Sequence, residues 1–264
     1  MSKLKGPKVL LFDIETAPII AYIWGLYDQN VSIDQIKSDW HILSWSAKWL
    51  GTDEMLYADN RASKNIENDK KILKQIWKLL NDADVVITQN GKKFDVKKLN
   101  ARFIIHGFRP PSTFKHIDTL QLARKYFSFT SNKLEYLSNT LNKKFKKLTK
   151  RKFNGFELWK ECLAGNKKAW DEMEKYNKRD VLALEEVYKK LIPWDSSVNF
   201  NHYFDESKPI CSACGHTKFL KNGYAYTQKG KFQKFTCRNC GNLTRSTKNL
   251  FNKEKLAALR VSVK

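Results

Sequence analysis

Four of the five cysteines in this 264-residue chain form two Cys-x-x-Cys pairs, a pattern that strongly constrains how the C-terminal part can fold. The first pair is Cys211 and Cys214, the second is Cys237 and Cys240, and a glycine follows each pair. This spacing lets two thiolates face one ion, and the glycine permits the tight turn beneath it. The pattern predicts a four-cysteine zinc ribbon over residues 208–246, holding one structural Zn²⁺.

The residues between the two pairs support this interpretation. Strand-like segments at 219–226 and 231–236 flank Gln228-Lys229-Gly230, which predicts a hairpin. A segment of about 40 residues buries too little core to fold alone, so a bound metal would supply folding energy. The alternative, two disulfides in a secreted module, is disfavoured because the N-terminal sequence lacks a signal-type apolar segment. His216 could compete for zinc, and the lone Cys162 is predicted to be a small buried hydrophobic residue.

Positive charge is concentrated in the same C-terminal region. The chain has 49 Lys and Arg against 27 Asp and Glu, a net charge of +22. Residues 207–264 hold 13 of the basic residues and one acidic residue, Glu254, and so carry over half of the excess. This density favours a polyanionic partner, with nucleic acid ahead of an acidic membrane surface; a lysine-rich composition that only solvates the surface is the alternative. No stretch approaches the roughly 18 apolar residues of a membrane span, so we expect a soluble, cytoplasmic protein that is not secreted.

The first 195 residues have the hydrophobic pattern of an α/β domain. Strands are predicted near residues 9–14, 42–50, 55–58, 84–88 and 114–118, and helices near 66–80, 94–106, 120–127, 134–141 and 168–191. Short strands followed by a βαβ region predict a mixed sheet flanked by helices. In the strand at 42–50, alternation predicts one wetter face, formed by Ser44, Ser46 and Lys48. We predict a linker at 196–207 and a basic tail at 247–264.

Two carboxylates interrupt the first apolar strand. Asp13 and Glu15 are two residues apart and so project from one face, at the carboxyl end of a strand that should be buried. Two such charges at 4 Å repel by roughly 4 kcal/mol at an effective dielectric of 20. A cation must therefore compensate the two negative charges, either a lysine in a structural ion pair or a bound metal.

Two later segments favour the metal. Asn90-Gly-Lys-Lys-Phe-Asp95 leads from a strand into a helix, and Tyr176-Asn-Lys-Arg-Asp180 puts a phenol and a carboxylate on one helix face. Together with Asp13-Ile-Glu15, and in this order, the segments resemble the three motifs of the DEDDy 3′→5′ exonucleases. These DnaQ-like enzymes have a ribonuclease H-like fold and include polymerase proofreading domains. The resemblance covers residues 7–192, and Phe156-Glu-Leu-Trp159 also resembles the free-standing, phage-type members.

The resemblance implies a two-metal mechanism of phosphodiester hydrolysis with Mg²⁺ or Mn²⁺. In that scheme Asp13 would bridge both ions, Glu15 and Asp180 would hold the ion that activates water, and Asp95 would support the second ion. Tyr176 would orient the attacking water, although a merely packed helix residue is the alternative for it.

Several neighbouring residues have two interpretations. The sister subgroup has a histidine five residues before the last aspartate, where this chain has Lys175, so the resemblance assigns the tyrosine subgroup. Asp118 could be a fifth acidic ligand, but a helix N-cap or a role in supporting the ligands is favoured. Trp24 and Tyr27 could stack a terminal base, but core packing is favoured.

Basic segments predict where nucleic acid would bind. Seven of the ten residues at 143–152 are basic, which is typical of a loop that grips phosphates or of a solvated lysine loop. The ribbon interleaves lysines with aromatic residues and resembles the DNA-binding ribbons of some transposase and phage proteins; a ribbon that binds replication or recombination proteins is the alternative. The predicted nucleic-acid contacts are Asn90, Lys143, Lys144, Lys147, Arg151, Lys221, Lys231, Lys234 and Arg238.

The favoured function is therefore a metal-dependent 3′→5′ exonuclease acting on DNA, with the ribbon holding the substrate. An RNA exonuclease or a structure-selective endonuclease of the same fold is the nearest alternative, because these motifs do not read the sugar. A nucleic-acid-binding regulatory protein with an inactive nuclease fold is the alternative of another class. Retention of all four carboxylates and Tyr176 argues against it.

Overall fold

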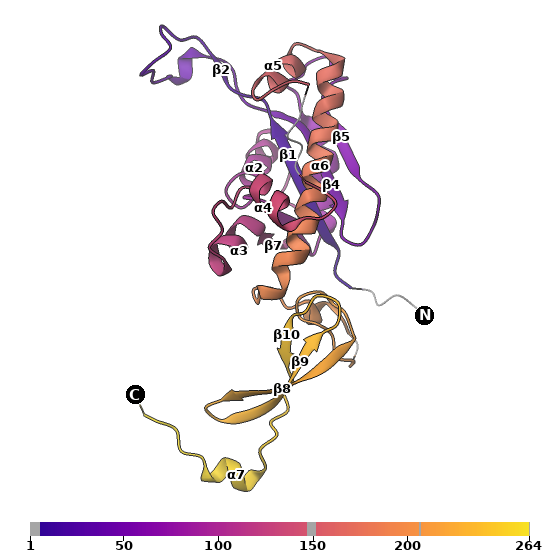
Figure 1. Ribbon diagram of the computed structural model, residues 1–264. Coiled ribbons are helices and arrows are strands. Elements are labelled where there is room, and N and C mark those ends of the chain that lie inside the picture. Colours follow the sequence, from indigo (N-terminus) through magenta and orange to yellow (C-terminus); the bar gives the residue numbers. More distant parts are fainter. Residues whose placement is uncertain (1–5, 147–151, 206, 264) are drawn as a thin grey trace. The chain divides into compact units, whose positions relative to one another are not determined.

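The computed structural model describes residues 6–146, 152–205 and 207–263, which form two compact units (Figure 1). The large unit is Lys8–Tyr188. The small unit contains the described residues from Lys189 onward together with Gly6 and Pro7, so the boundary falls in the last turn of a long helix. None of the helices among the described residues is long and apolar enough to span a membrane.

A five-stranded mixed sheet forms the centre of the large unit, in the order β5-β4-β1-β6-β7. β1 pairs antiparallel with β4 and parallel with β6; β5 is antiparallel to β4, and β7 is parallel to β6. The strands are β1 (Val9–Thr16), β4 (Ile42–Trp49), β5 (Leu56–Asp59), β6 (Val85–Thr88) and β7 (Lys115–Asp118). The mixed sheet with flanking helices confirms the fold class predicted from the sequence.

Helices cover both faces of this sheet (Figure 1). They are α1 (Lys70–Asp82), α2 (Asp95–Ile105), α3 (Thr119–Tyr126), α4 (Leu134–Leu141), α5 (Glu157–Leu163) and α6 (Lys167–Leu191). Leu10, Phe12 and Ile14 of β1 join α1 and α2 in one apolar core. A second core contains Trp170 and Met173 of α6. Because side chains alternate along a strand, the odd-numbered residues of β1 face away from the first core.

The predicted wet face of β4 is wrong. Ser44 and Ser46 are fully buried, and Lys48 is 6% exposed. The cause is α6, which covers this face and brings polar partners to it: Ser44 Oγ hydrogen-bonds to Asn177, and Lys48 forms an ion pair with Glu185. The polar side chains of this strand therefore marked a face that is buried beneath α6 rather than a face in contact with solvent.

An arm projects from the carboxyl end of β1 and connects it to β4 (Figure 1). It contains β2 (Ile20–Ala21), the 3-10 helix η1 (Ile33–Gln35) and β3 (Ile36–Ser38), with β2 and β3 paired outside the main sheet. Trp24 is 97% exposed and Tyr27 is 84% exposed. The expectation that these two residues pack in the core is wrong, because their segment belongs to the arm, which extends away from the main sheet and its cores.

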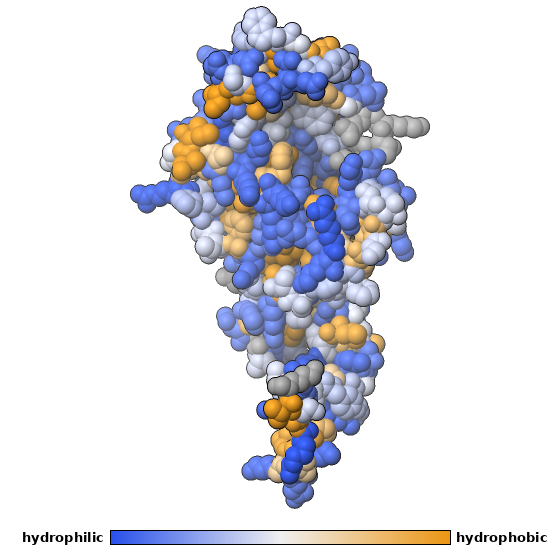
Figure 2. Space-filling view, turned by 90° about the vertical axis from the view of Figure 1, so that its left-hand side faces the viewer, coloured by the Kyte–Doolittle hydropathy of each residue, from blue (hydrophilic) through white to orange (hydrophobic). Residues whose placement is uncertain are grey.

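The small unit is built on an antiparallel sheet in the order β10-β9-β8. It comprises the 3-10 helices η2 (Ile192–Trp194) and η3 (Phe200–Tyr203), β8 (Phe219–Thr227), β9 (Gly230–Cys237), β10 (Leu243–Arg245) and α7 (Lys253–Ala258). The predicted hairpin is present, since β8 and β9 meet at Thr227 and Gly230. Hydrophilic side chains cover most of the molecular face in Figure 2, with hydrophobic groups scattered among them toward both its upper and its lower end.

Candidate active site and metal-ligand clusters

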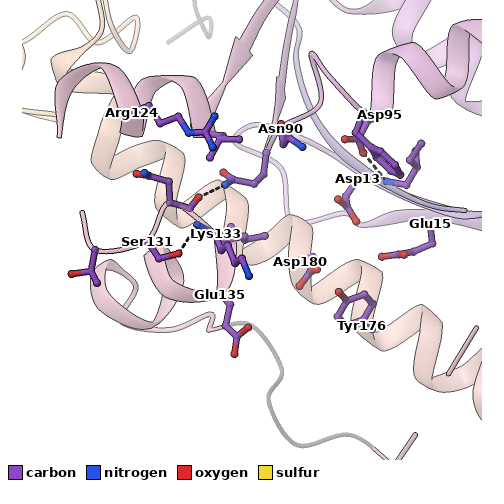
Figure 3. Close-up of a pocket in the computed structure, with 17 residues that line it drawn as sticks. Asp13, Glu15, Asn90, Asp95, Arg124, Ser131, Lys133, Glu135, Tyr176 and Asp180 are labelled. Carbon is purple, nitrogen blue, oxygen red and sulfur yellow. Dashed lines mark hydrogen bonds between the residues drawn. The ribbon is translucent and has the colours of Figure 1, made fainter. Parts of the chain in front are cut away.

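Three carboxylates meet at the carboxyl end of β1. Asp13, Glu15 and Asp180 each offer an oxygen, and these atoms all lie within 4.8 Å of one another (Figure 3). The first two come from the odd-numbered face of β1, and Asp180 comes from α6, where it is 4% exposed. The structure therefore brings together three of the residues that the sequence analysis proposed as metal ligands.

The electrostatics of this cluster call for a cation. Two carboxylates no more than 4.8 Å apart repel by at least roughly 3.5 kcal/mol at an effective dielectric of 20, and burial of Asp180 makes solvent less able to screen the charges. Hard oxygen donors are the ligands that Mg²⁺ and Mn²⁺ prefer. The donor set of Asp13, Glu15 and Asp180 therefore fits a divalent cation of this kind.

Asp95 lies in the same pocket but outside the three-carboxylate cluster. It is the first residue of α2, it is 3% exposed, and its Oδ1 accepts a hydrogen bond of 3.2 Å from the Ile14 N–H. Burial raises the pKa of Asp95 to about 7, and the nearby charge of Asp118 adds to this effect. Without a cation, this carboxyl therefore keeps its proton until near neutral pH.

Asn177 is a site residue that the sequence reasoning missed. It is fully buried on α6, and its Nδ2 donates to Asp13 Oδ2 at 2.7 Å and to the Asp13 carbonyl at 3.3 Å. Ser44 Oγ lies 3.4 Å from Asn177 Oδ1 and donates to it. The sequence carried no distinct signal for it, because α6 contains many polar residues and only its packing against β1 shows that Asn177 faces Asp13.

Asp118 is a helix cap, as the favoured interpretation predicted. Its carboxylate accepts from the Leu120 N–H at the start of α3, and also from the backbone N–H groups of Asn90 and Lys92. Asn90 needs such support because its φ of +65° is in the left-handed region. Asp118 thus fixes the turn between β6 and α2, and this turn places Asp95.

A cavity of about 640 Å³ surrounds the carboxylates, a size typical of ligand sites. Tyr176 lines it and is 6% exposed, with its ring centroid 6.1 Å from that of Trp159, so it is both packed and directed at the site. Arg124 and Lys133 line the α3–α4 side (Figure 3). The sequence reasoning missed both, because only the folded chain brings the end of α3 and the start of α4 to β1. The lining residues are Asp13, Ile14, Glu15, Gln89, Asn90, Phe94, Asp95, Leu120, Arg124, Thr130, Ser131, Asn132, Lys133, Leu134, Glu135, Tyr176 and Asp180.

The predicted nucleic-acid contacts are distributed over several places. Asn90 lines the cavity, whereas Lys143 and Lys144 do not; their backbone N–H groups donate to the Glu186 carboxylate. Lys147 and Arg151 lie outside the described residues.

The ribbon residues of this prediction do not share one face. Lys231 and Lys234 are three residues apart on β9 and so project from opposite faces. The Lys231 ammonium lies 4.0 Å from the ring centroid of Tyr224 on β8, whereas Lys234 lies opposite Arg245 of β10 in the strand register. Lys221 is on β8, and Arg238 is exposed just after β9.

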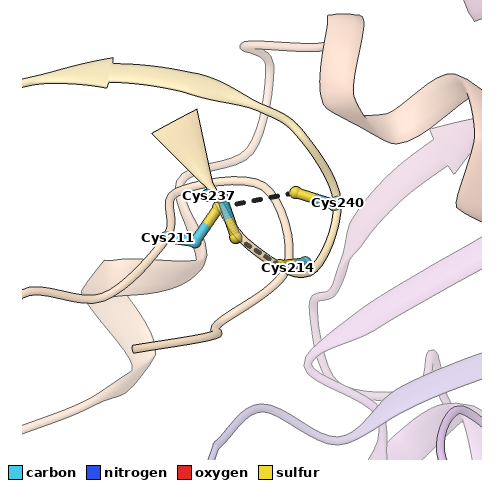
Figure 4. A group of neighbouring side chains, drawn as sticks. All are labelled: Cys211, Cys214, Cys237 and Cys240. Carbon is cyan, nitrogen blue, oxygen red and sulfur yellow. Dashed lines mark hydrogen bonds between the residues drawn. The ribbon is translucent and has the colours of Figure 1, made fainter. Parts of the chain in front are cut away.

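The four paired cysteines converge in the small unit (Figure 4). All four Sγ atoms lie within 4.8 Å, and the separations Cys211–Cys240 and Cys214–Cys237 are each 3.7 Å. A disulfide requires about 2.05 Å, whereas sulfurs about 2.3 Å from a tetrahedral Zn²⁺ are roughly 3.8 Å apart. A hydrogen bond from the Cys211 thiol lowers the pKa of Cys214 to about 4, so one thiolate is already favoured. The cluster fits a zinc ion and does not fit two disulfides.

The fold and the site together define an α/β protein with an acidic cavity at the carboxyl end of its central strand, where three carboxylates could hold a cation. A family model described as the RNase H superfamily matches residues 46–192, more than half of the sequence. The chain belongs to the RNase H superfamily, and its mixed sheet flanked by helices is the RNase H-like fold.

Comparison with individual proteins gives a more distant likeness. The chain is similar in structure to the family B DNA polymerase from the hyperthermophilic archaeon Pyrobaculum calidifontis, with 12% sequence identity and a TM-score of 0.46. The match covers 71% of this chain and 26% of the polymerase, so the chain spans about a quarter of that protein's length. No curated protein matches the sequence.

Proposed function

We propose that this protein is a metal-dependent 3′→5′ exonuclease of the DEDDy type that hydrolyses phosphodiester bonds of DNA. The observation that carries the proposal is the convergence of Asp13, Glu15 and Asp180 within 4.8 Å, in a cavity that Asp95 and Tyr176 also line. Structural ion pairs do not need three mutually repelling carboxylates at the edge of a cavity. A site that binds divalent cations and a phosphodiester does need such a cluster of carboxylates.

Each residue has a role in this scheme. Asp13, Glu15 and Asp180 would hold Mg²⁺ or Mn²⁺, with Asp95 as a further ligand; when bound, the cations neutralise phosphate charge and activate water. The Tyr176 hydroxyl would orient the water, since a phenol is a poor base at neutral pH but a good hydrogen-bond partner. Arg124 and Lys133 would position the substrate phosphates from the opposite wall.

Asn177 would act through Asp13. Its amide fixes the Asp13 carboxylate by a 2.7 Å hydrogen bond, so this carboxylate is already oriented before any cation binds. Outer partners of this kind orient ligands and tune their affinity for the metal.

The C-terminal unit is proposed to be a zinc ribbon that holds nucleic acid. The 3.7 Å sulfur separations support one tetrahedral Zn²⁺, and the high density of Lys and Arg supports a polyanionic partner. In this proposal residues 1–195 are the exonuclease domain, 196–207 the linker, 208–246 the ribbon and 247–264 the basic tail. Tethering would raise the local concentration of substrate at the nuclease.

The test uses matched DNA and RNA strands, each labelled at either end, with Mg²⁺ or Mn²⁺. We expect stepwise shortening of DNA from the 3′ end by the unmodified protein and none by Asp13→Ala or Asp180→Ala. Asp53→Ala, an exposed loop aspartate, serves as the control and should remain fully active. Cleavage of RNA alone, or internal cuts, would replace the proposal with an RNA exonuclease or an endonuclease. Full activity of Asp13→Ala would overturn the assignment of the site.

A further inference from the structure

A second cleft, of about 620 Å³, lies wholly within the small unit. Its walls are the end of α6, η2 and the turn that carries the second cysteine pair. The residues relevant to binding are Lys189, Lys190, Trp194 and Leu243. None of them belongs to the acidic cavity or to the four-cysteine cluster.

Two large apolar side chains in this cleft are open to solvent. Trp194 is 62% exposed and Leu243 is 57% exposed, although Ile192 and Phe200 in the same unit are only 3% exposed. The unit therefore has a core, and these two side chains are outside it. An aromatic and an aliphatic side chain that line one open cleft form an apolar surface that a ligand could reach.

The accessible charge in the cleft is positive. Lys189 and Lys190 are both exposed. Asp195, the one carboxylate that lines the cleft among the described residues, is 4% exposed, and it accepts hydrogen bonds from the backbone N–H and hydroxyl of Ser197. Lysines at a helix C-terminus suit the helix dipole, but the dipole does not explain an exposed tryptophan beside them.

Hydrogen bonds hold the walls of this cleft together. Asn242 Nδ2 donates to the Pro193 carbonyl at 2.7 Å, directly before Trp194. The Asn242 carbonyl accepts from the Cys237 N–H at 2.9 Å, so the same residue is also tied to the cysteine cluster. The position of Trp194 relative to the turn is thus set before any ligand binds.

We propose that this cleft binds single-stranded nucleic acid, with a base stacked on Trp194 and against Leu243 and with adjacent phosphates at Lys189 and Lys190. An exposed aromatic ring beside cations is the combination that binds single strands without sequence preference. The nucleic-acid contacts would then be at η2 and the end of α6 rather than on the β8–β9 hairpin. The inference rests on the proposed function only for the identity of the strand, because binding can be measured apart from cleavage.

The test measures fluorescence anisotropy of labelled oligothymidylate and oligouridylate of about 20 nucleotides, with full-length protein and no added divalent cation. We expect Trp194→Ala to weaken binding roughly tenfold, within the range that stacking on one aromatic residue provides, and Trp194→Phe to retain most of it. Replacing Lys189 and Lys190 by Gln should reduce the slope of log affinity against log salt by about 1.4, since each single-strand phosphate contact contributes about 0.7.

Matched variants decide the outcome. Lys253→Gln with Lys255→Gln removes the same charge from exposed positions of α7. This double variant should reduce the slope of log affinity against log salt by less than the Lys189 and Lys190 double variant does. Tyr226→Ala removes a ring that is 67% exposed on the hairpin. Binding that depends on Tyr226 and not on Trp194, for both oligonucleotides, would overturn the proposal. Unchanged zinc content in Trp194→Ala confirms that the unit is intact. If the unmodified protein shows no nuclease activity but Trp194→Ala still abolishes binding of the oligonucleotides, the proposed function would be rejected. The assignment of this cleft as a nucleic-acid-binding site would then still stand.

Discussion

Asn177 on α6 donates a 2.7 Å hydrogen bond to Oδ2 of Asp13 on β1, and so connects the two elements that supply the three clustered carboxylates. The same amide bonds to the Asp13 carbonyl and accepts from Ser44 on β4. The geometry of the acidic cluster therefore depends on a neutral residue that is not itself a candidate ligand.

We expect Asn177→Ala to weaken Mn²⁺ binding by about 10- to 100-fold, the usual effect of removing an outer partner of a metal ligand. The measurement is the cation concentration at half-maximal thermal stabilisation, which does not depend on activity. Asn100→Ala, at an exposed position of α2, is the control. If the variant lost stability but kept the Mn²⁺ midpoint, Asn177 would be only a packing residue.

The buried Asp95 predicts a pH-dependent stability of the cation-free protein. Its pKa in the folded state is about 7, above the ordinary value of 3.8, so the folded state binds the proton more tightly. Stability should fall as pH rises from about 4 to about 7, by up to about 4 kcal/mol at about 1.4 kcal/mol per pKa unit. Asp95→Asn should remove this fall and stabilise the protein at pH 8 but not at pH 4. Equal stabilisation at both pH values would show that the effect is not titration of Asp95.

Removal of zinc should unfold the small unit and leave the large one intact. A unit with few buried apolar residues depends on its metal for folding energy. We expect one zinc per chain by elemental analysis, and none in Cys237→Ser. Chelation should open the lysines and arginines between 218 and 245 to trypsin, while cleavage of the large unit stays unchanged. Cys162→Ala, outside the cluster, is the control that should retain zinc.

Replacing Trp24 in the arm and Trp170 in the core should have very different effects on the free energy of unfolding. Trp24→Ala should change the free energy of unfolding by less than about 0.5 kcal/mol, because the side chain is 97% exposed. Trp170→Ala should cost about 3–5 kcal/mol, because that side chain is 2% exposed in the α6 core. Chemical denaturation of both variants measures the difference. A large cost for Trp24→Ala would mean that the arm packs against the protein in solution.

Local pattern predicted the main strands and helices of the large unit, and the resemblance to the exonuclease motifs selected the residues of the acidic site. The β1 carboxylates and the Tyr176 and Asp180 pair could be recognised because strand and helix periodicity fix which side chains share a face. Arg124, Lys133 and Asn177 could not be found in this way, since they reach the site only through packing between elements distant in sequence. Burial of Ser44 and Lys48 was missed for the same reason: their partners are on α6.

The alternation of side chains along β1 also limits how this protein can change during evolution. Odd-numbered residues carry the carboxylates, and even-numbered residues fill the core beneath α1 and α2. Inserting or deleting one residue between Val9 and Phe12 would exchange the two faces, sending Asp13 and Glu15 into apolar packing. Two-residue changes would preserve the faces. We therefore expect length variation among natural relatives to be absent from this strand and to accumulate in the arm that follows it.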